Sequence, residues 1–65
     1  MRIAVNGETI EVSGATLAQI LDELGYGGAK VATAVNEKFV PAGMREARKL
    51  EADDRVEIVS PRQGG

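Results

Sequence analysis

An Asn-Gly pair close to the start of the sequence constrains the fold more than any other feature. On both sides of Asn6-Gly7, apolar residues alternate with polar or small ones over residues 1–12. Asn and Gly tolerate the positive φ that both central residues of a type I′ turn adopt, and this turn commonly links two antiparallel strands. The pattern predicts a hairpin over residues 1–12 with one apolar face.

A short amphipathic helix is expected next, beginning at Thr16. Thr16 and Gln19 have the spacing of a capping box, in which each side chain accepts a hydrogen bond from the other residue's backbone N–H. Gly25 is a typical left-handed end for such a helix. Because so short a helix is unstable alone, its apolar stripe must pack against a sheet. The stripe consists of Leu17, Ile20, Leu21 and Leu24.

Two strands are predicted in the middle of the chain. Residues 31–36 alternate between Val or Thr on one face and Ala32 and Ala34 on the other. Small side chains let a helix approach closely, so we expect the alanine face to lie toward the helix. After a turn, residues 39–40 form a short strand, which ends at Pro41 because proline has no N–H for a ladder.

The second half of the chain predicts one more strand. Residues 42–50 are expected to be irregular, with Leu50 in the core. Asp53-Asp54 makes a turn, and alternating apolar residues mark a last strand over residues 55–60. The element order is therefore β-β-α-β-β-β. A hairpin, a helix and further strands that complete a mixed sheet over that helix form the β-grasp, or ubiquitin-like, roll of the α+β class.

Composition limits the size and the chemistry of this fold. A chain of 65 residues makes at most one small domain, which we place at residues 1–60, with residues 61–65 as a flexible tail ending in Gly-Gly. The sequence has no cysteine and no histidine, which excludes disulfides, thiolate nucleophiles and the commonest metal ligand and general base. We therefore expect a protein that is not an enzyme and binds no metal or cofactor itself.

Charge and hydropathy exclude further classes. A formal net charge of −2 argues against a general affinity for nucleic acid or for anionic membranes. No apolar run approaches the roughly 20 residues of a membrane-spanning helix, and no signal-peptide pattern opens the chain. The sequence predicts a cytoplasmic protein that is monomeric when free.

Three groups of residues can be interpreted either as functional sites or as ordinary features of the fold. The acidic residues within 51–57 could ligate a metal, although solvated turn chemistry is commoner for such a cluster. Arg45, Arg48 and Lys49 form a basic group that either faces solvent or docks a partner. The glycines within 25–28 follow a helix instead of preceding one, which favours a helix end over a phosphate-binding loop.

The end of the sequence carries the one feature that indicates a reaction. Pro61 releases the chain from the last strand, and Gly64 and Gly65 leave a carboxylate with almost no steric bulk behind it. A carboxylate is ionised at neutral pH and is a poor electrophile. Before it accepts a nucleophile it must become an acyl adenylate, which requires ATP and a partner enzyme. The plainer explanation is a frayed terminus or an expression remnant.

Five stretches are spread over essentially the whole chain: IAVNGETIEV, TLAQILDELG, VATAVNEKFVP, LEADDRVEIV and the terminal GG. Together they resemble the ThiS family, the sulfur carriers of thiamine biosynthesis. The resemblance implies that a ThiF-like adenylyltransferase uses MgATP to adenylate the Gly65 carboxylate, with Gly64 giving access. It also implies that a cysteine desulfurase relay supplies the sulfur of a thiocarboxylate, which thiazole synthase takes for thiazole formation.

Other β-grasp functions stay open on the sequence. The small subunit of molybdopterin synthase resembles this chain in fold and uses the same terminal chemistry, but that family is usually longer. A ubiquitin-like modifier would join Gly65 to a lysine of a target protein. A plain adaptor would keep its activity without Gly64 and Gly65.

We expect the adenylating enzyme to dock on the sheet face away from the helix and beside the tail. Phe39 belongs to an edge-like strand, and Val59 and Arg62 flank the start of the tail. These three are the predicted partner-binding residues.

Overall fold

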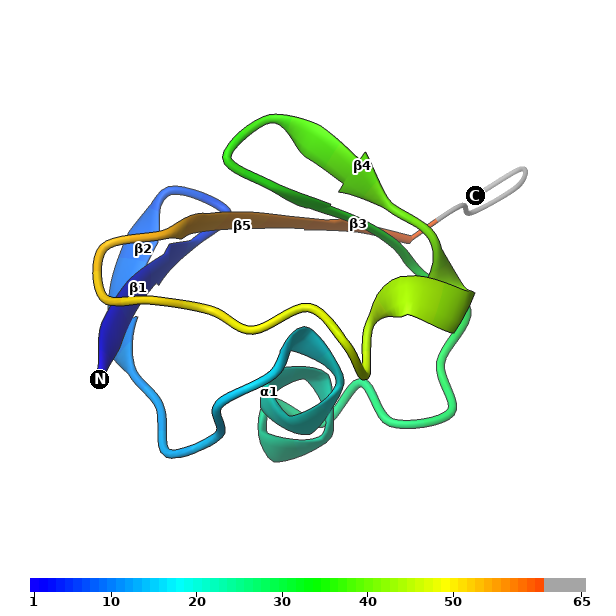
Figure 1. Cartoon of the computed structure of the whole chain (residues 1–65), viewed down its shortest axis with the longest axis horizontal. Coiled ribbons are helices and arrows are strands. Elements are labelled where there is room, and N and C mark those ends of the chain that lie inside the picture. Colours follow the sequence, from blue (N-terminus) through cyan, green and yellow to red (C-terminus); the bar gives the residue numbers. More distant parts are fainter. Residues whose placement is uncertain (61–65) are drawn as a thin grey trace.

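The computed structural model of the protein describes residues 1–60. Within this range a five-stranded sheet lies across one α-helix (Figure 1). In chain order the elements are β1 (Arg2–Val5), β2 (Glu8–Glu11), α1 (Leu17–Glu23), β3 (Ala32–Val35), β4 (Lys38–Val40), the 3₁₀ helix η1 (Ala42–Met44) and β5 (Arg55–Val59).

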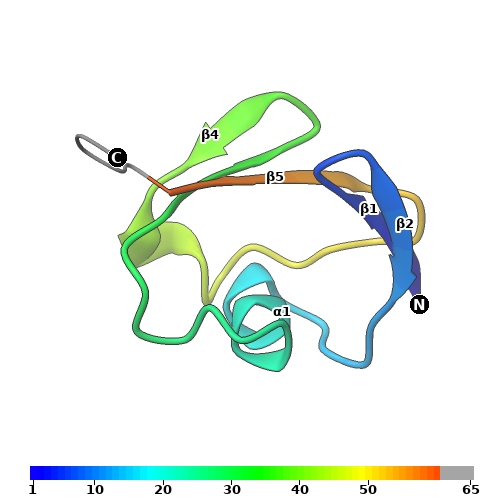
Figure 2. The same ribbon diagram turned by 180° about the vertical axis from the view of Figure 1, so that it is seen from behind.

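The sheet has the strand order β2-β1-β5-β3-β4, so the strand that comes last in the sequence lies in the middle. β1 and β5 run parallel, and the other neighbouring strands are antiparallel. α1 covers one face of this mixed sheet, and in residues 1–60 no helix covers the opposite face (Figures 1 and 2). The arrangement is a β-grasp, which confirms the predicted fold class and element order.

One hydrophobic core lies between α1 and the inner face of the sheet. Along β5 the alternation is complete, because Val56 and Ile58 are buried whereas the three residues around them are exposed. Each fully buried aliphatic side chain contributes about 1.5–3 kcal/mol to stability. The core consists of Ile3, Val12, Leu17, Ile20, Leu21, Val35, Val40, Leu50, Val56 and Ile58.

Both ends of α1 are fixed as the sequence predicts. Thr16 Oγ1 accepts a hydrogen bond from the Gln19 N–H at 3.2 Å, and Gln19 Oε1 accepts one from the Thr16 N–H at 3.3 Å. Beyond the helix, Gly25 has a φ of 92°, so the chain leaves through the left-handed conformation. These interactions define a helix of only seven residues, whose buried residues all belong to its apolar stripe.

The predicted orientation of β3 is wrong. Ala32 and Ala34 lie on the outer face of the sheet, and Thr33 and Val35 are the buried residues, with 2% and 0% exposure. The larger Val35 side chain removes more apolar surface from water than alanine would. The Thr33 hydroxyl is accommodated because it donates to the Val40 carbonyl oxygen at 2.9 Å. Inward-facing alanines would leave this part of the core underfilled.

Residues 42–50 are more ordered than predicted. The segment opens with η1 and is tied to β3 and the chain before it through the Arg45 guanidinium. Arg45 Nε donates to Thr33 Oγ1 at 3.0 Å, and Nη2 donates to the Val31 carbonyl oxygen at 2.6 Å. Leu50 is 6% exposed, which confirms its predicted place in the core. The segment therefore has a fixed shape despite its lack of long helices or strands.

Both hairpins turn through two residues with positive φ. These angles are 52° and 86° at Asn6 and Gly7, and 51° and 73° at Asn36 and Glu37. Positive φ at both positions is the mark of a type I′ turn. The first turn confirms the sequence prediction. For the second, the sequence predicted a turn but not its type.

Candidate docking site at the end of the last strand

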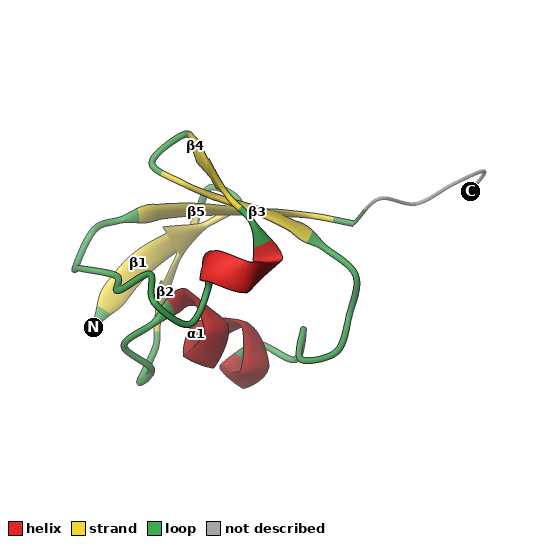
Figure 3. Cartoon of the chain, turned by 45° about the vertical axis from the view of Figure 1, so that its right-hand side comes forward, coloured by secondary structure: helices red, strands yellow, loops and turns green. Residues whose placement is uncertain are grey.

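Three large hydrophobic side chains of the described residues are exposed, and all three come from the same end of the sheet. Phe39 is 69% exposed, Val59 is 60% and Met44 is 57%. β3 is antiparallel to both β4 and β5, so the last residues of β4 and β5 flank the first residues of β3. η1 lies at this end as well (Figures 1 and 3). Apolar side chains exposed together indicate an interaction surface.

Phe39 and Val59 lie on the outer face of the sheet, separated by the alanines of β3. Phe39 is directly opposite Ala34, and Val59 is directly opposite Ala32. Residues directly opposite each other in antiparallel strands project to the same face. We call these four residues the sheet patch. The two predicted partner-binding residues within residues 1–60 thus share one exposed apolar surface, and their role stays a prediction.

A groove lies beside the sheet patch, between β4 and the segment that follows it. Its lining includes Phe39 from the sheet patch, together with Met44, and its charged residues Lys38 and Arg48 are both basic. We call this the β4 groove. It is lined by Lys38, Phe39, Val40, Pro41, Met44, Ala47 and Arg48.

Sequence reasoning missed Met44. Its spacing from Ala47 and Leu50 fits one helical turn with a buried face, so Met44 resembles a core residue. The structure forms only the short helix η1 here, and Met44 projects outward while Leu50 is buried. Gly43, which breaks the helical pattern one residue earlier, was the available signal.

Asn6 fixes the position of β5 close to the strand's end. Its Oδ1 accepts a hydrogen bond from the Ile58 N–H at 2.8 Å, and its Nδ2 donates to the Ile58 carbonyl oxygen at 3.2 Å. The side chain thus continues the pairing that β1 makes with β5 as far as Val56. Val59, the last residue of β5, directly follows Ile58, so these hydrogen bonds fix the position of the strand's end. The remaining predicted site residues, Arg62, Gly64 and Gly65, lie outside the described residues, as does the whole predicted tail.

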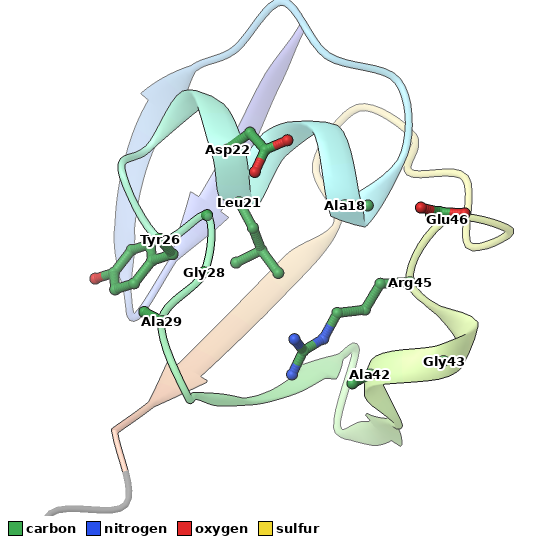
Figure 4. A pocket seen from close by; sticks show the side chains of 11 residues that line it. Ala18, Leu21, Asp22, Tyr26, Gly28, Ala29, Ala42, Gly43, Arg45 and Glu46 are labelled. Atoms are coloured by element: carbon green, nitrogen blue, oxygen red, sulfur yellow. The ribbon is translucent and has the colours of Figure 1, made fainter.

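A second hollow lies between α1, the loop after it and η1 (Figure 4). Arg45 reaches into it, while Asp22 and Glu46 also line it. The guanidinium is already hydrogen-bonded to Thr33 and to the Val31 carbonyl oxygen. With charges of both signs and its arginine engaged in the fold, this hollow indicates no particular ligand. Arg45, one of the three predicted basic residues, has a structural role.

The acidic residues at the start of β5 act in a turn. Asp54 Oδ2 accepts from the Glu51 N–H at 2.8 Å, and Oδ1 accepts from the Asn36 amide at 3.0 Å. Burial acts to raise the pKa of Asp54, but these two hydrogen bonds and the positive charge of Arg48 together outweigh it and hold the pKa below its usual value. Within residues 1–60 no three acidic side chains gather as a metal site. The turn explanation is therefore the one that the contacts support.

In the part of the chain that the structure describes, no helix has both the length and the apolar character to cross a bilayer.

Comparisons with known proteins point to one family. The model of the ThiS family matches residues 3–65. The crystal structure of a thiamine biosynthesis protein (ThiS) from Geobacter metallireducens is similar, with a TM-score of 0.84, 26% identity and full coverage of both chains. An NMR solution structure of a thiamine biosynthesis protein from the same organism has a TM-score of 0.78 and 25% identity, covering 100% of this chain and 88% of that one. The comparison with curated proteins gave no match.

Proposed function

Because this chain belongs to the ThiS family, we propose that it is a cytoplasmic sulfur carrier for thiamine biosynthesis and not itself an enzyme. The observation that carries the proposal is the extent of the family match, which runs through the described domain and on to Gly65. In this proposal Gly65 is the last residue and its carboxylate is the reacting group.

The reaction begins with activation of that carboxylate by a ThiF-like adenylyltransferase. A carboxylate oxygen attacks the α-phosphorus of MgATP, which releases pyrophosphate and leaves an acyl adenylate. The terminal sulfur of a persulfide, supplied by a cysteine desulfurase relay, then attacks the acyl carbon and expels AMP. A thiol reduces the resulting acyl disulfide to the thiocarboxylate, and thiazole synthase takes the sulfur from it.

The folded domain contributes recognition to this cycle. Gly64 and Gly65 have no Cβ, so they can enter a channel too narrow for other residues. The tail begins after β5, where the sheet patch is exposed, so we expect an enzyme that takes the tail to contact this patch as well. We assign Phe39 and Val59, with Arg62 beyond them, to the docking of the adenylating enzyme. MgATP binds to that enzyme, and the carrier holds no cofactor of its own.

Intact mass measurement tests the proposal directly. The purified protein is incubated with the adenylyltransferase, MgATP, the desulfurase, cysteine and a thiol. We expect a mass increase equal to the replacement of one oxygen by sulfur. The same treatment of the chain lacking Gly65 controls for sulfur added elsewhere. An unchanged mass for the full-length chain would contradict the carrier function.

The same experiment distinguishes the related functions. Incubation of the thiocarboxylate with thiazole synthase and deoxyxylulose phosphate, which accepts the sulfur, should restore the original mass, whereas molybdopterin synthase components should not. Covalent conjugates to other proteins that survive reduction would instead indicate a ubiquitin-like modifier. Full activity without Gly64 and Gly65 would indicate an adaptor.

A further inference from the structure

The β4 groove has the position, the surface and the charge of a docking site that extends the sheet patch. Thr33 pairs with Val40 on one side, and its neighbour Ala32 pairs with Val59 on the other. The end of β4, from which the groove begins, is therefore close to the end of β5. In the proposed function an enzyme takes the tail that follows Ser60, so we expect its surface to lie over this end of the sheet and to reach the groove.

The surface of the groove is apolar where it is most exposed. Phe39 and Met44, at 69% and 57% exposure, are two of the three exposed large hydrophobic side chains of residues 1–60. Pro41 and Ala47 add apolar surface between them. Methionine adapts its shape readily, which suits a side chain that receives an apolar group from a partner.

The rim of the groove is basic in a chain whose net charge is −2. Lys38 and Arg48 are the charged residues of the lining, and neither makes an ion pair within residues 1–60. Arg48 Nη1 donates to the Lys49 carbonyl oxygen at 2.7 Å, and its charge also acts on Asp54. A partner that approached this rim with carboxylates would gain from both cations, whereas a basic partner would be repelled.

We propose that the β4 groove receives an apolar side chain flanked by carboxylates from the adenylating enzyme. The inference rests on the proposed function and adds the chemistry of the partner's surface. The sheet patch supplies an uncharged apolar contact, and the groove supplies the charge pairing that selects the partner.

Steady-state kinetics of adenylation test this pairing. The KM for the carrier is measured by ATP–pyrophosphate exchange on the adenylyltransferase, at low and at high salt, for Lys38→Glu and Arg48→Glu. We expect each reversal to raise KM about tenfold at low salt, with a smaller ratio at high salt and little change in kcat. Met44→Ser should raise KM severalfold at both salt concentrations.

Arg2→Glu is the matched control. Arg2 is exposed at the start of β1, whereas the groove adjoins the far end of β5, and β1 and β5 are parallel. This variant carries the same change of charge as the others, so its KM should stay within about twofold of wild type. Far-UV circular dichroism and urea unfolding confirm that every variant folds.

The outcomes separate the inference from the function on which it rests. If wild type and the groove variants have the same KM, and wild-type Gly65 is still adenylated, the groove does not dock this enzyme while the carrier function stands. If wild type is not adenylated at all, the proposed function fails and the inference fails with it. A concentration-dependent dimer that Met44→Ser abolishes would assign the groove to a second copy of the chain and overturn the proposal.

Discussion

The two hairpins of the sheet have the same turn geometry but different residues at the second turn position. Each turns through two residues with positive φ, and each begins the turn with asparagine. The first turn continues with Gly7 at 86° and the second with Glu37 at 73°. For a residue with a Cβ, the left-handed conformation costs about 1–2 kcal/mol. Asparagine tolerates this conformation and glutamate does not, so the second hairpin carries more backbone strain than the first.

The asparagines explain why both turns keep this geometry. Asn6 forms its two side-chain hydrogen bonds with Ile58, near the end of β5. Asn36 Oδ1 accepts from the Arg55 N–H at 2.9 Å, at the start of β5, and its own N–H donates to the Arg55 carbonyl oxygen at 2.7 Å. The two turns thus hold the central strand at opposite ends, and the geometry of each turn is set partly by a strand far away in sequence.

The largest effect is expected for Asn6→Ala. The substitution loses both hydrogen bonds to Ile58 and places alanine at a positive φ, so the free energy of unfolding should fall by about 2–3 kcal/mol. Urea unfolding measures this change. Asn6→Gly keeps the permitted φ and loses only the hydrogen bonds, so its loss should be the smaller of the two. Equal stability of Asn6→Ala and wild type would show that β5 does not depend on this turn.

A smaller loss is expected for Asn36→Ala. The side-chain hydrogen bonds of Asn36 are exposed, whereas those of Asn6 are partly buried, so water replaces more of the bonding at Asn36. The free energy of unfolding should fall by about 1–2 kcal/mol. A loss greater than that of Asn6→Ala, measured in the same urea series, would reverse the assigned importance of the two turns.

Exchanging the second turn residues tests the strain itself. A Cβ at Gly7 would meet nothing within 4 Å, so Gly7→Glu changes only the backbone preference and should destabilise the protein by about 1 kcal/mol. Glu37→Gly should stabilise it by about 0.5–1 kcal/mol. The Glu37–Arg55 ion pair, at 3.8 Å and largely exposed, offsets little of this gain. Thermal unfolding measures both variants. A Glu37→Gly protein less stable than wild type would refute the strain argument.

The smallest effect is a pH dependence at the second turn. The pKa of Asp54 lies below its value in the unfolded chain, so its contribution is present above the unfolded pKa and is lost as pH falls through the folded one. Because Asp54 is only partly buried and its hydrogen bonds are exposed to water, this contribution should be under about 1 kcal/mol. The stability gap between wild type and Asp54→Asn should therefore shrink below about pH 4. Urea unfolding at a series of pH values measures the gap, and a constant gap would contradict the argument.

Local signals in the sequence predict much of this fold. Asn6-Gly7, the Thr16–Gln19 capping box and Gly25 each determine structure through contacts within a few residues, and all three are confirmed. The inward face of β3 could not be predicted in that way. Whether Ala34 or Val35 faces the core depends on the space between β3 and α1, which only the assembled fold defines.

In the candidate site, too, some residues could be predicted from local sequence and others could not. Phe39 and Val59 could be selected because a short edge strand and the end of the last strand are visible in the sequence. Met44 and Arg48 line the same groove only because of the path that residues 42–50 take. The hydrogen bonds of Arg45 to Thr33 and Val31 fix that path. No local pattern encodes that path.

The central place of β5 also bears on how the protein is made. During synthesis β1 through η1 leave the ribosome first, yet β1 and β3 are not neighbours in the sheet and are joined only through β5, which lies between them. The nascent chain can form its hairpins and helix early, but its long-range pairing must wait. The sheet therefore closes only around its final strand, and a chain interrupted before that point offers a partner enzyme no finished surface to recognise.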